Sequence, residues 1–380
     1  MSQTNYDIII SGGGMAGLSA VWHLLNSSMH DQRILLVDKE RKYKNDRTFC
    51  FWETKAGLFE PVVKFAWDSV YFHSNTYNKK INIAPYQYKM IIGNEFYDFV
   101  NEKISQAPNV HTLLGDIESV SADGSVKVAG KTYTSNWVLN SVPFQKIDKD
   151  STQYLDQHFK GWIIETEEDI FDTEAPVMMD FRIPQHEETR FLYVLPFSSK
   201  KALVEVAIFS NNHLTQAGYD DILKDYISKY ILTAKQPYDI VEEEYGVIPM
   251  TDFKFDAGEG KVINIGTAGG HTKASSGYTF YKVQQFLQEI IPMLAKDINP
   301  LNKVVTKKPR FSFYDSILLN VMLKNRVGID KAFSSMFKNN PPPRLLGFLN
   351  EETNFFQEVQ VMRTAPIIPF TKALPDYFFG

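Results

Sequence analysis

The stretch that decides the fold is residues 6–17, YDIIISGGGMAG. Its apolar first half predicts a buried strand, and a helical pattern follows directly over 15–26. Between the two, Gly12, Gly14 and Gly17 have the spacing G-x-G-x-x-G. In that context the first glycine permits a tight turn, the second lets a phosphate approach the backbone, and the third lets helix and strand pack closely. The stretch therefore predicts a dinucleotide-binding turn.

A second apolar strand over 34–37 ends in Asp38, about twenty residues after the glycines. A carboxylate at this place can accept hydrogen bonds from ribose hydroxyls. The helix that begins at Met15 and Ala16 offers free N–H groups to a pyrophosphate. Strand, turn, helix and strand form one βαβ unit of the Rossmann type. We expect FAD rather than NAD because the unit opens the chain and a second glycine loop occurs late.

That late loop follows a short apolar strand over 261–265 and contains Gly266, Gly269 and Gly270. A helix from about 276 to 290 is expected next, and its start could face the pyrimidine edge of a flavin. Thr267 stands where many FAD enzymes have an acid. An ordinary glycine turn between sheet and helix is an equally good interpretation. We predict that the three glycines contact the cofactor and that the chain returns here to the first domain.

The composition limits the other possibilities. A chain of 380 residues, 44% of them hydrophobic, can bury a large cofactor in two packed domains or one interleaved domain. Its net charge of -5 without a basic stripe argues against nucleic acid as a partner. The single cysteine, Cys50, excludes an internal disulfide framework, and no cluster has metal-ligand spacing. No signal peptide or run of about 18 apolar residues is seen, so we expect a cytoplasmic protein.

The coarse pattern predicts an α/β fold in which a Rossmann-type FAD-binding domain is interleaved with an antiparallel β-sheet substrate domain and a helical C-terminal region. Short aromatic and β-branched strands over 161–208 indicate the antiparallel sheet. The predicted division is an FAD-binding part over 1–75, a mixed segment with the substrate sheet over 76–255, a return over 256–295 and a helical region over 296–380.

Several sequence blocks form a set that is far more specific than any single motif. They are Asp46–Trp52, Gly161–Trp162, Met179–Phe181, Phe191–Phe197, Ile248–Met250, Gly269–Gly270, Ser275–Tyr278, Phe311–Asp315 and Phe348–Thr353. This set, which spans nearly the whole chain, resembles the flavin-dependent lycopene cyclase family of bacteria. Three positions depart from the family pattern. Phe49 stands where tryptophan is frequent, Ser276 where threonine is common, and Val206 where a second acid often follows Glu205.

The resemblance implies an enzyme that closes the linear ends of lycopene or a related carotene into β-ionone rings, giving γ-carotene and β-carotene. An end double bond is protonated, a neighbouring double bond attacks the cation, and a proton is lost. The family uses reduced FAD without net redox change, and NADPH is the expected electron source. An FAD-dependent oxidoreductase, either a polyprenyl reductase or a hydroxylase, is the alternative. Val206 also leaves open a binding protein that has lost catalysis.

The resemblance makes Glu205 the catalytic acid. It is a lone carboxyl in an apolar strand, so burial would raise its pKa, although strand alternation could equally turn it to solvent. Aromatic faces can stabilise a carbocation as they do other cations. The residues predicted to line the substrate channel are Phe51, Trp52, Trp162 and Tyr193.

Other polar residues have weaker assignments. Asp46 and Arg47 could contact flavin or form a surface ion pair, and His271 could approach the flavin or be structural. Glu351 and Glu352 could act as secondary acid or base, although a solvated helix face explains them better.

A hydrocarbon substrate also implies peripheral contact with a membrane surface, here the inner membrane. The stretches 317–323 and 345–349 could form an interfacial surface, or could simply cover the core. The cations near these stretches are Lys324, Arg326, Lys338 and Arg344.

Overall fold

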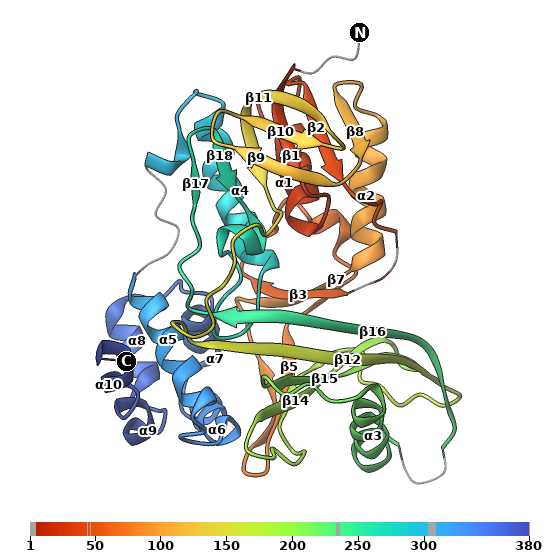
Figure 1. Ribbon diagram of the computed structural model, residues 1–380. Coiled ribbons are helices and arrows are strands. Elements are labelled where there is room, and N and C mark those ends of the chain that lie inside the picture. Colours follow the sequence, from red (N-terminus) through yellow and green to blue (C-terminus); the bar gives the residue numbers. More distant parts are fainter. Residues whose placement is uncertain (1–4, 44, 46, 233–235, 303–308, 380) are drawn as a thin grey trace.

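The computed structural model describes residues 5–43, 45, 47–232, 236–302 and 309–379. Figure 1 shows a Rossmann-like α/β layer at one end, two long strands crossing below it, and a group of C-terminal helices beside them. Asp46 lies outside the described residues. The α/β class predicted from the sequence is confirmed.

The first sheet has parallel strands in the order β18-β11-β1-β2-β8. Helix α1 follows the glycine turn and packs beside α4 and α2. Short strands β9, β10 and β17 pair antiparallel at its margins. The elements are β1 (Asn5–Ser11), α1 (Met15–Leu25), β2 (Ile34–Asp38), α2 (Gly93–Ser105), β8 (Val110–Leu114), β9 (Ile117–Ser121), β10 (Ser125–Val128), β11 (Lys131–Asn140), β17 (Gly258–Glu259), β18 (Val262–Asn264) and α4 (Phe280–Leu294).

The second sheet has seven strands in the order β16-β12-β15-β14-β13-β5-β6. All neighbours are antiparallel except β13 beside β5. Helix α3 covers one face of it. The elements are β5 (Ser69–His73), β6 (Asn78–Asn82), β12 (Tyr154–Thr166), β13 (Val177–Asp180), β14 (Thr189–Ser198), β15 (Lys201–Phe209), α3 (Gln216–Tyr226), the π-helical turn Ile227–Ile231 and β16 (Tyr238–Thr251).

A small sheet joins the two large ones in the order β3-β7-β4. Its strands are β3 (Thr48–Glu53), β4 (Phe65–Trp67) and β7 (Gln87–Ile92). The span 76–255, predicted as one mixed segment, therefore contributes strands to all three sheets. The chain crosses repeatedly between the cofactor layer and the second sheet, so the two share residues at their junction.

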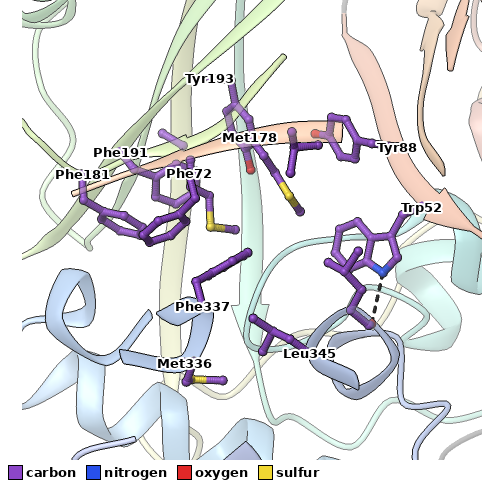
Figure 2. Close-up of a cluster of buried hydrophobic side chains, with 14 of the residues drawn as sticks. Trp52, Phe72, Tyr88, Met178, Phe181, Phe191, Tyr193, Met336, Phe337 and Leu345 are labelled. Atoms are coloured by element: carbon purple, nitrogen blue, oxygen red, sulfur yellow. Dashed lines mark hydrogen bonds between the residues drawn. The ribbon is translucent and has the colours of Figure 1, made fainter. Parts of the chain in front are cut away.

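The C-terminal helices cover the face of the second sheet that α3 leaves open. They are α5 (Pro309–Leu323), α6 (Ile329–Asn339), α7 (Pro342–Leu349), α8 (Phe355–Met362), α9 (Ile367–Thr371) and α10 (Leu374–Phe379). Prolines end α6 and begin α7, because proline is tolerated only in the first turn of a helix. Figure 2 shows the packing: Phe337 of α6 stacks on Phe72 of β5, with ring centroids 4.3 Å apart.

Two elements differ from the sequence prediction at their ends. Helix α4 begins at Phe280 rather than near residue 276, because Gly277 has a φ of +74° that a helix cannot contain. The amphipathic pattern over 219–232 predicts a single helix, but the α-helix α3 ends at Tyr226 and the chain continues as a π-helical turn. Over the described ranges, no helix combines the length and apolarity needed to cross a bilayer.

Candidate functional site

The glycine turn after β1 has the shape of a phosphate cradle. Gly12 has a φ of +97°, and a Cβ at Gly17 would lie 1.8 Å from the Gly12 carbonyl oxygen, so both positions need glycine. Among the described residues, none lies within 4 Å of a Cβ built at Gly14, and no side chain there caps α1. The space beside Gly14, at the start of α1 at Met15 and Ala16, is thus open, which fits a dinucleotide pyrophosphate.

Asp38 lies at the end of β2, directly beside this turn. Its Oδ2 accepts a hydrogen bond from the Gly13 N–H at 2.5 Å, and Oδ1 accepts one from the Glu40 N–H at 3.3 Å. A carboxylate has about four acceptor positions, so these bonds leave room for a ribose hydroxyl. Asp38 therefore lies beside the glycine turn, and its binding of ribose stays a prediction.

The late glycine loop lies against the same helix terminus. A Cβ at Gly266 would be 2.6 Å from the Ala16 Cβ, and both Gly266 and Gly270 have positive φ. Gly269 leaves room for the Asn264 carbonyl oxygen, which would be 2.2 Å from a Cβ there. The fold thus brings together the two loops predicted to hold FAD, and the residues present fit that group.

His271, next in the loop, has a structural environment. Its Nδ1 lies 3.2 Å from the Gly266 carbonyl oxygen, and its ring packs on Phe286 with centroids 4.0 Å apart. Thr267, which stands in place of the frequent acid, lies within hydrogen-bonding distance of Thr272, with hydroxyl oxygens 3.2 Å apart. These contacts stabilise the loop backbone next to α1.

Four residues form a line across neighbouring strands of the second sheet. Tyr193 of β14 is paired with Glu205 of β15, Glu205 with Gly161 of β12, and Gly161 with Glu244 of β16. Residues directly opposite one another in an antiparallel sheet project to the same face. The three side chains therefore share the face covered by the C-terminal helices and the β3–β7 strands.

Gly161 allows the two carboxyl groups to meet. A Cβ there would lie 3.2 Å from the Glu205 Cβ and 3.2 Å from the Glu244 Cγ, and only 2.7 Å from Leu203 Cδ1. The side chains of Glu205 and Glu244 thus lie next to each other over the glycine, and each carboxyl shifts the pKa of the other. This arrangement gives the Gly161–Trp162 sequence block a physical role, since any larger residue would separate the acids.

Burial first, and then the Glu244 carboxyl, raise the pKa of Glu205 well above its usual range. Burial also raises the pKa of Glu244, and this is opposed by the neighbouring Glu205 carboxyl, by the hydrogen bond from Thr48 and by the charge of Arg47. The Thr48 hydroxyl donates to Glu244 Oε2 at 3.2 Å. Burial and the neighbouring Glu244 both favour the protonated form of Glu205, whose side chain is only partly exposed.

Oxygen atoms of three tyrosines gather near Glu205. Burial raises the pKa of Tyr88, Tyr193 and Tyr278. The Tyr278 hydroxyl further raises the pKa of Tyr88 and Tyr193, whereas those two hydroxyls lower the pKa of Tyr278. Among the described residues, no group lies at hydrogen-bonding distance and angle from the buried hydroxyls of Tyr88 and Tyr278. Buried polar groups without partners are uncommon and costly, and they are frequent at functional sites. Their lone pairs are available to face a positive charge. Cys50, beside them, is held as a thiol because burial raises its pKa.

A small apolar pocket opens beside Tyr193 and Tyr278. Its volume is about 30 Å³. The pocket lies between the sheet and helices α5 and α6. It is lined by Met179, Phe181, Thr189, Phe191, Tyr193, Phe209, Ser275, Ser276, Tyr278, Leu318, Met322, Ile329 and Phe333. The aromatic rings seen in Figure 2 continue this apolar lining toward Trp52 and α7.

Trp162 does not lie with the other predicted channel residues. It faces the opposite side of the sheet, in a buried cluster with Val204, Val206 and residues of α3. Successive side chains of a β-strand point to opposite faces of the sheet, so Trp162 points away from the face on which Gly161 lies between Glu205 and Glu244. The structure thus corrects the expectation that Trp162 lines the channel with Tyr193. Val206 is fully buried on the same α3 face, so a second acid at that position would not join Glu205.

Phe51 and Trp52 point to different sides of β3. Phe51 stacks on Phe280 in the core of the cofactor layer and borders a separate cavity of about 380 Å³. Trp52 packs in the core beneath the C-terminal helices, where its Nε1–H donates to the Leu346 carbonyl oxygen at 3.1 Å. Of the four predicted aromatic residues, Trp52 and Tyr193 share the core on the Glu205 side.

Glu351 belongs to a largely buried ion-pair network, whereas Glu352 is exposed and is bound by two tyrosine hydroxyls. Glu351 accepts from Lys273 at 2.9 Å and Lys282 at 3.0 Å. Glu352 accepts from Tyr86 at 2.6 Å and from Tyr281 at 2.9 Å. These contacts fix the α7–α8 junction to the late glycine loop and to α4.

The two stretches expected at a membrane surface are mostly buried. Ile317 is 6% exposed and Leu345 1% exposed, because α5 and α7 cover the sheet. Lys324 and Arg326 form ion pairs with Asp376. Exposed apolar side chains lie instead on the last three helices: Phe355, Phe356 and Val359 of α8, Ile367 and Ile368 of α9, and Tyr377 and Phe378 of α10.

Comparisons with known proteins agree with this architecture. The family model described as "Lycopene cyclase protein" matches residues 7–374. The lycopene beta-cyclase of Pantoea ananas is 25% identical over 267 residues, which are 66% of this chain and 63% of that protein. The match therefore spans less than two thirds of that relative's length.

Solved structures share the fold at low identity. A geranylgeranyl bacteriochlorophyll reductase-like protein from Thermoplasma acidophilum has a TM-score of 0.58 at 10% identity, covering 99% of this chain and 97% of that one. A flavin-dependent halogenase from Xanthomonas campestris also has a TM-score of 0.58 at 10% identity, covering 96% and 89%. Such likeness identifies a fold that flavin-dependent enzymes use.

Proposed function

Because the chain belongs to the lycopene cyclase family, we propose that it is a lycopene β-cyclase that closes the linear ends of lycopene into β-ionone rings. The observation that carries this proposal is Glu205, a carboxyl with a strongly raised pKa that projects from an apolar strand beside an aromatic pocket. Such a group stays protonated near neutral pH and can donate its proton to a double bond. The product is an isomer of the substrate.

The surroundings of Glu205 support the later steps. Protonation creates a tertiary carbocation, which water would trap, so the site must be dry. The lining of the pocket is mostly aromatic and aliphatic, and the Tyr88, Tyr193 and Tyr278 oxygens add electron-rich groups. Positive charge is stabilised by aromatic faces as in other cation–π contacts. The ring then loses a proton to a carboxylate on the same sheet face.

FAD is the proposed cofactor, held by Gly12, Gly14, Gly17 and Asp38 on one side and by the late loop Gly266–Gly270 on the other. When bound in its reduced form, it would supply an electron-rich ring that stabilises positive charge. NADPH is the proposed source of its electrons. The chain's own contribution is to fix the two loops against each other at Ala16.

The rival function is a redox reaction on the same fold, favoured by the likeness to a reductase-like structure. Mass spectrometry of the product separates the two. Purified protein with FAD, a reductant and lycopene in vesicles should give a product of unchanged mass and consume no stoichiometric NADPH. A product heavier by two hydrogens or one oxygen, with one NADPH used per event, would establish the reductase or hydroxylase instead.

A hydrocarbon substrate dissolves in bilayers, so the proposal extends to a peripheral position on the inner membrane, facing the cytoplasm. The exposed apolar residues on α8, α9 and α10 would form the surface that meets the membrane. All three helices lie at the same end of the molecule (Figure 1). Exposed apolar side chains near cations favour an interfacial position. Arg363 and Lys372 are the exposed cations among them.

Vesicle flotation tests this position. Wild-type protein should float with vesicles that contain anionic lipid, and Phe356→Glu with Ile368→Glu should reduce the bound fraction about tenfold or more. Val247→Glu, at an exposed position of β16, is the matched control and should float like wild type. If all three proteins float equally, or if none of them floats, the proposed membrane-binding surface on α8–α10 is wrong.

A further inference from the structure

The second acid of the site, Glu244, lies outside the sequence blocks that resemble the family. The frequent second position of the family, here Val206, faces α3 on the other side of the sheet. On the Glu205 side the second carboxyl is Glu244 of β16, two strands away along the same line. It is 5% exposed, although its neighbours Glu242 and Glu243 are exposed.

We propose that Glu205 and Glu244 act as one catalytic unit, the carboxyl pair, in which a single proton is shared over Gly161 and passed to the substrate from Glu205. This inference rests on the proposed cyclase function. Its geometric basis is the Glu205–Gly161–Glu244 register and the absence of a Cβ at Gly161, whose place the two side chains fill.

The hydrogen bonds assign the charge within the pair. Glu244 Oε2 accepts from the Thr48 hydroxyl, and Arg47 adds favourable positive charge. Glu244 Oε1 is buried and, among the described residues, receives no bond from an ordinary N–H or O–H donor. The carboxyl of Glu205 is the neighbour that can donate to it. The resting state is therefore protonated Glu205 bound to ionised Glu244.

The chemistry balances without any redox partner. The Glu205 O–H bond breaks, and the π electrons of the end double bond form a C–H bond with that proton. Both carboxyls are then ionised and face the tertiary cation at close range, where low dielectric strengthens the attraction. The neighbouring double bond supplies the ring C–C bond. The electrons of a ring C–H bond form the new double bond, and its proton returns to the carboxyl pair.

A neighbouring anion makes a carboxyl harder to ionise, so Glu244 keeps Glu205 protonated at higher pH. Glu244→Gln keeps the size and can still accept from Thr48, but removes the charge. We expect the alkaline limb of the pH profile of kcat/KM to move to lower pH by about one unit or more, with conversion at least tenfold slower. Glu243→Gln is the matched control, because Glu243 is the adjacent residue on β16 and pairs with Lys160 on the other face.

Infrared difference spectroscopy supplies a readout apart from activity. Wild-type protein should retain a protonated carboxyl C=O band above neutral pH. That band should vanish in Glu205→Gln and titrate at lower pH in Glu244→Gln. Flavin content and melting temperature check that each variant is folded.

The outcomes separate the pair from the cyclase function. One outcome would overturn the carboxyl pair and leave the cyclase function standing. In it, Glu205→Gln loses conversion, whereas Glu244→Gln keeps the wild-type rate, alkaline limb and infrared titration. Isomerisation that persists unchanged in Glu205→Gln would remove the proposed acid itself.

Discussion

The two faces of the seven-stranded sheet use the same strands for different purposes. On the α3 face, Trp162, Val204 and Val206 pack in an apolar cluster. On the face toward the C-terminal helices, the residues at alternate positions include Glu205, Glu244 and Tyr193. The α3 face stabilises the fold, whereas the other buries carboxyl and hydroxyl groups at a cost in stability. Buried polar groups that cost stability are characteristic of sites kept for chemistry.

The largest effect is expected from placing an acid on the wrong face. Val206→Glu recreates the family's frequent second acid, but puts it in the apolar cluster under α3. We expect a loss of about 3 kcal/mol in the free energy of unfolding, measured by urea denaturation. It should not restore conversion in the Glu205→Gln background. Restored conversion in that double variant would show that position 206 reaches the site.

Gly161→Ala tests the close approach of the two acids. The added Cβ would meet both carboxyl side chains and Leu203, so we expect about 2 kcal/mol of destabilisation and a clear loss of conversion. Gly218→Ala is the control, since its Cβ would meet nothing closer than 3.3 Å. Wild-type rates and pH profile in Gly161→Ala would mean that the carboxyl groups need not touch.

The faces should also respond to pH in opposite directions. Glu205 has a raised pKa, so the native state binds more protons than the unfolded chain, and stability falls as pH rises above the ordinary carboxyl value. On the α3 face, burial lowers the pKa of His158 to about 4, so stability falls as pH drops from 6.5 toward 4. Each group can contribute up to about 1.4 kcal/mol per pH unit.

Melting temperatures over a pH series check this contrast. Glu205→Gln should flatten the alkaline side of the curve, and His158→Asn should flatten the acid side. Unchanged curves in both variants would mean that neither group titrates differently in the folded protein.

The smallest effect is expected for Trp162→Phe. Trp162 packs under α3, so the variant should lose about 1 kcal/mol of stability while conversion at saturating substrate stays as in wild type. Denaturation and product assays on one preparation measure both. Slower conversion with unchanged stability would place Trp162 in the substrate channel after all.

Sequence patterns predicted those parts that depend on near neighbours. The turn at Gly12–Gly17 and the strand that ends in Asp38 form as expected, because turn geometry and strand–helix packing are local. The aromatic strands of the second sheet were also recognisable from composition. That these loops bind flavin stays a prediction.

Parts that depend on strand register were not predictable. Glu244 stands in the run Glu242–Glu244, which looks like a solvated acidic edge, and only its pairing with Gly161 shows that it meets Glu205. The face of Glu205 itself was undecided for the same reason. A weak signal existed, since a glycine within an apolar strand often marks a close approach of other groups.

Long-range packing also decided the C-terminal region. An amphipathic pattern is the same for a helix that covers a core and one that lies on a membrane. The pattern over 317–323 and 345–349 thus could not show that α5 and α7 are buried, nor that the exposed apolar residues lie on α8–α10.

The most direct test of the account is pigment analysis of lycopene-accumulating bacterial cells that express wild-type protein, Glu205→Gln or Glu243→Gln at equal levels. We predict γ-carotene and β-carotene from wild type and Glu243→Gln, and a loss of about a thousandfold in Glu205→Gln. Equal cyclisation by Glu205→Gln, or unchanged lycopene with folded, flavin-loaded wild-type protein, would contradict the assignment of Glu205 as the acid of a lycopene cyclase.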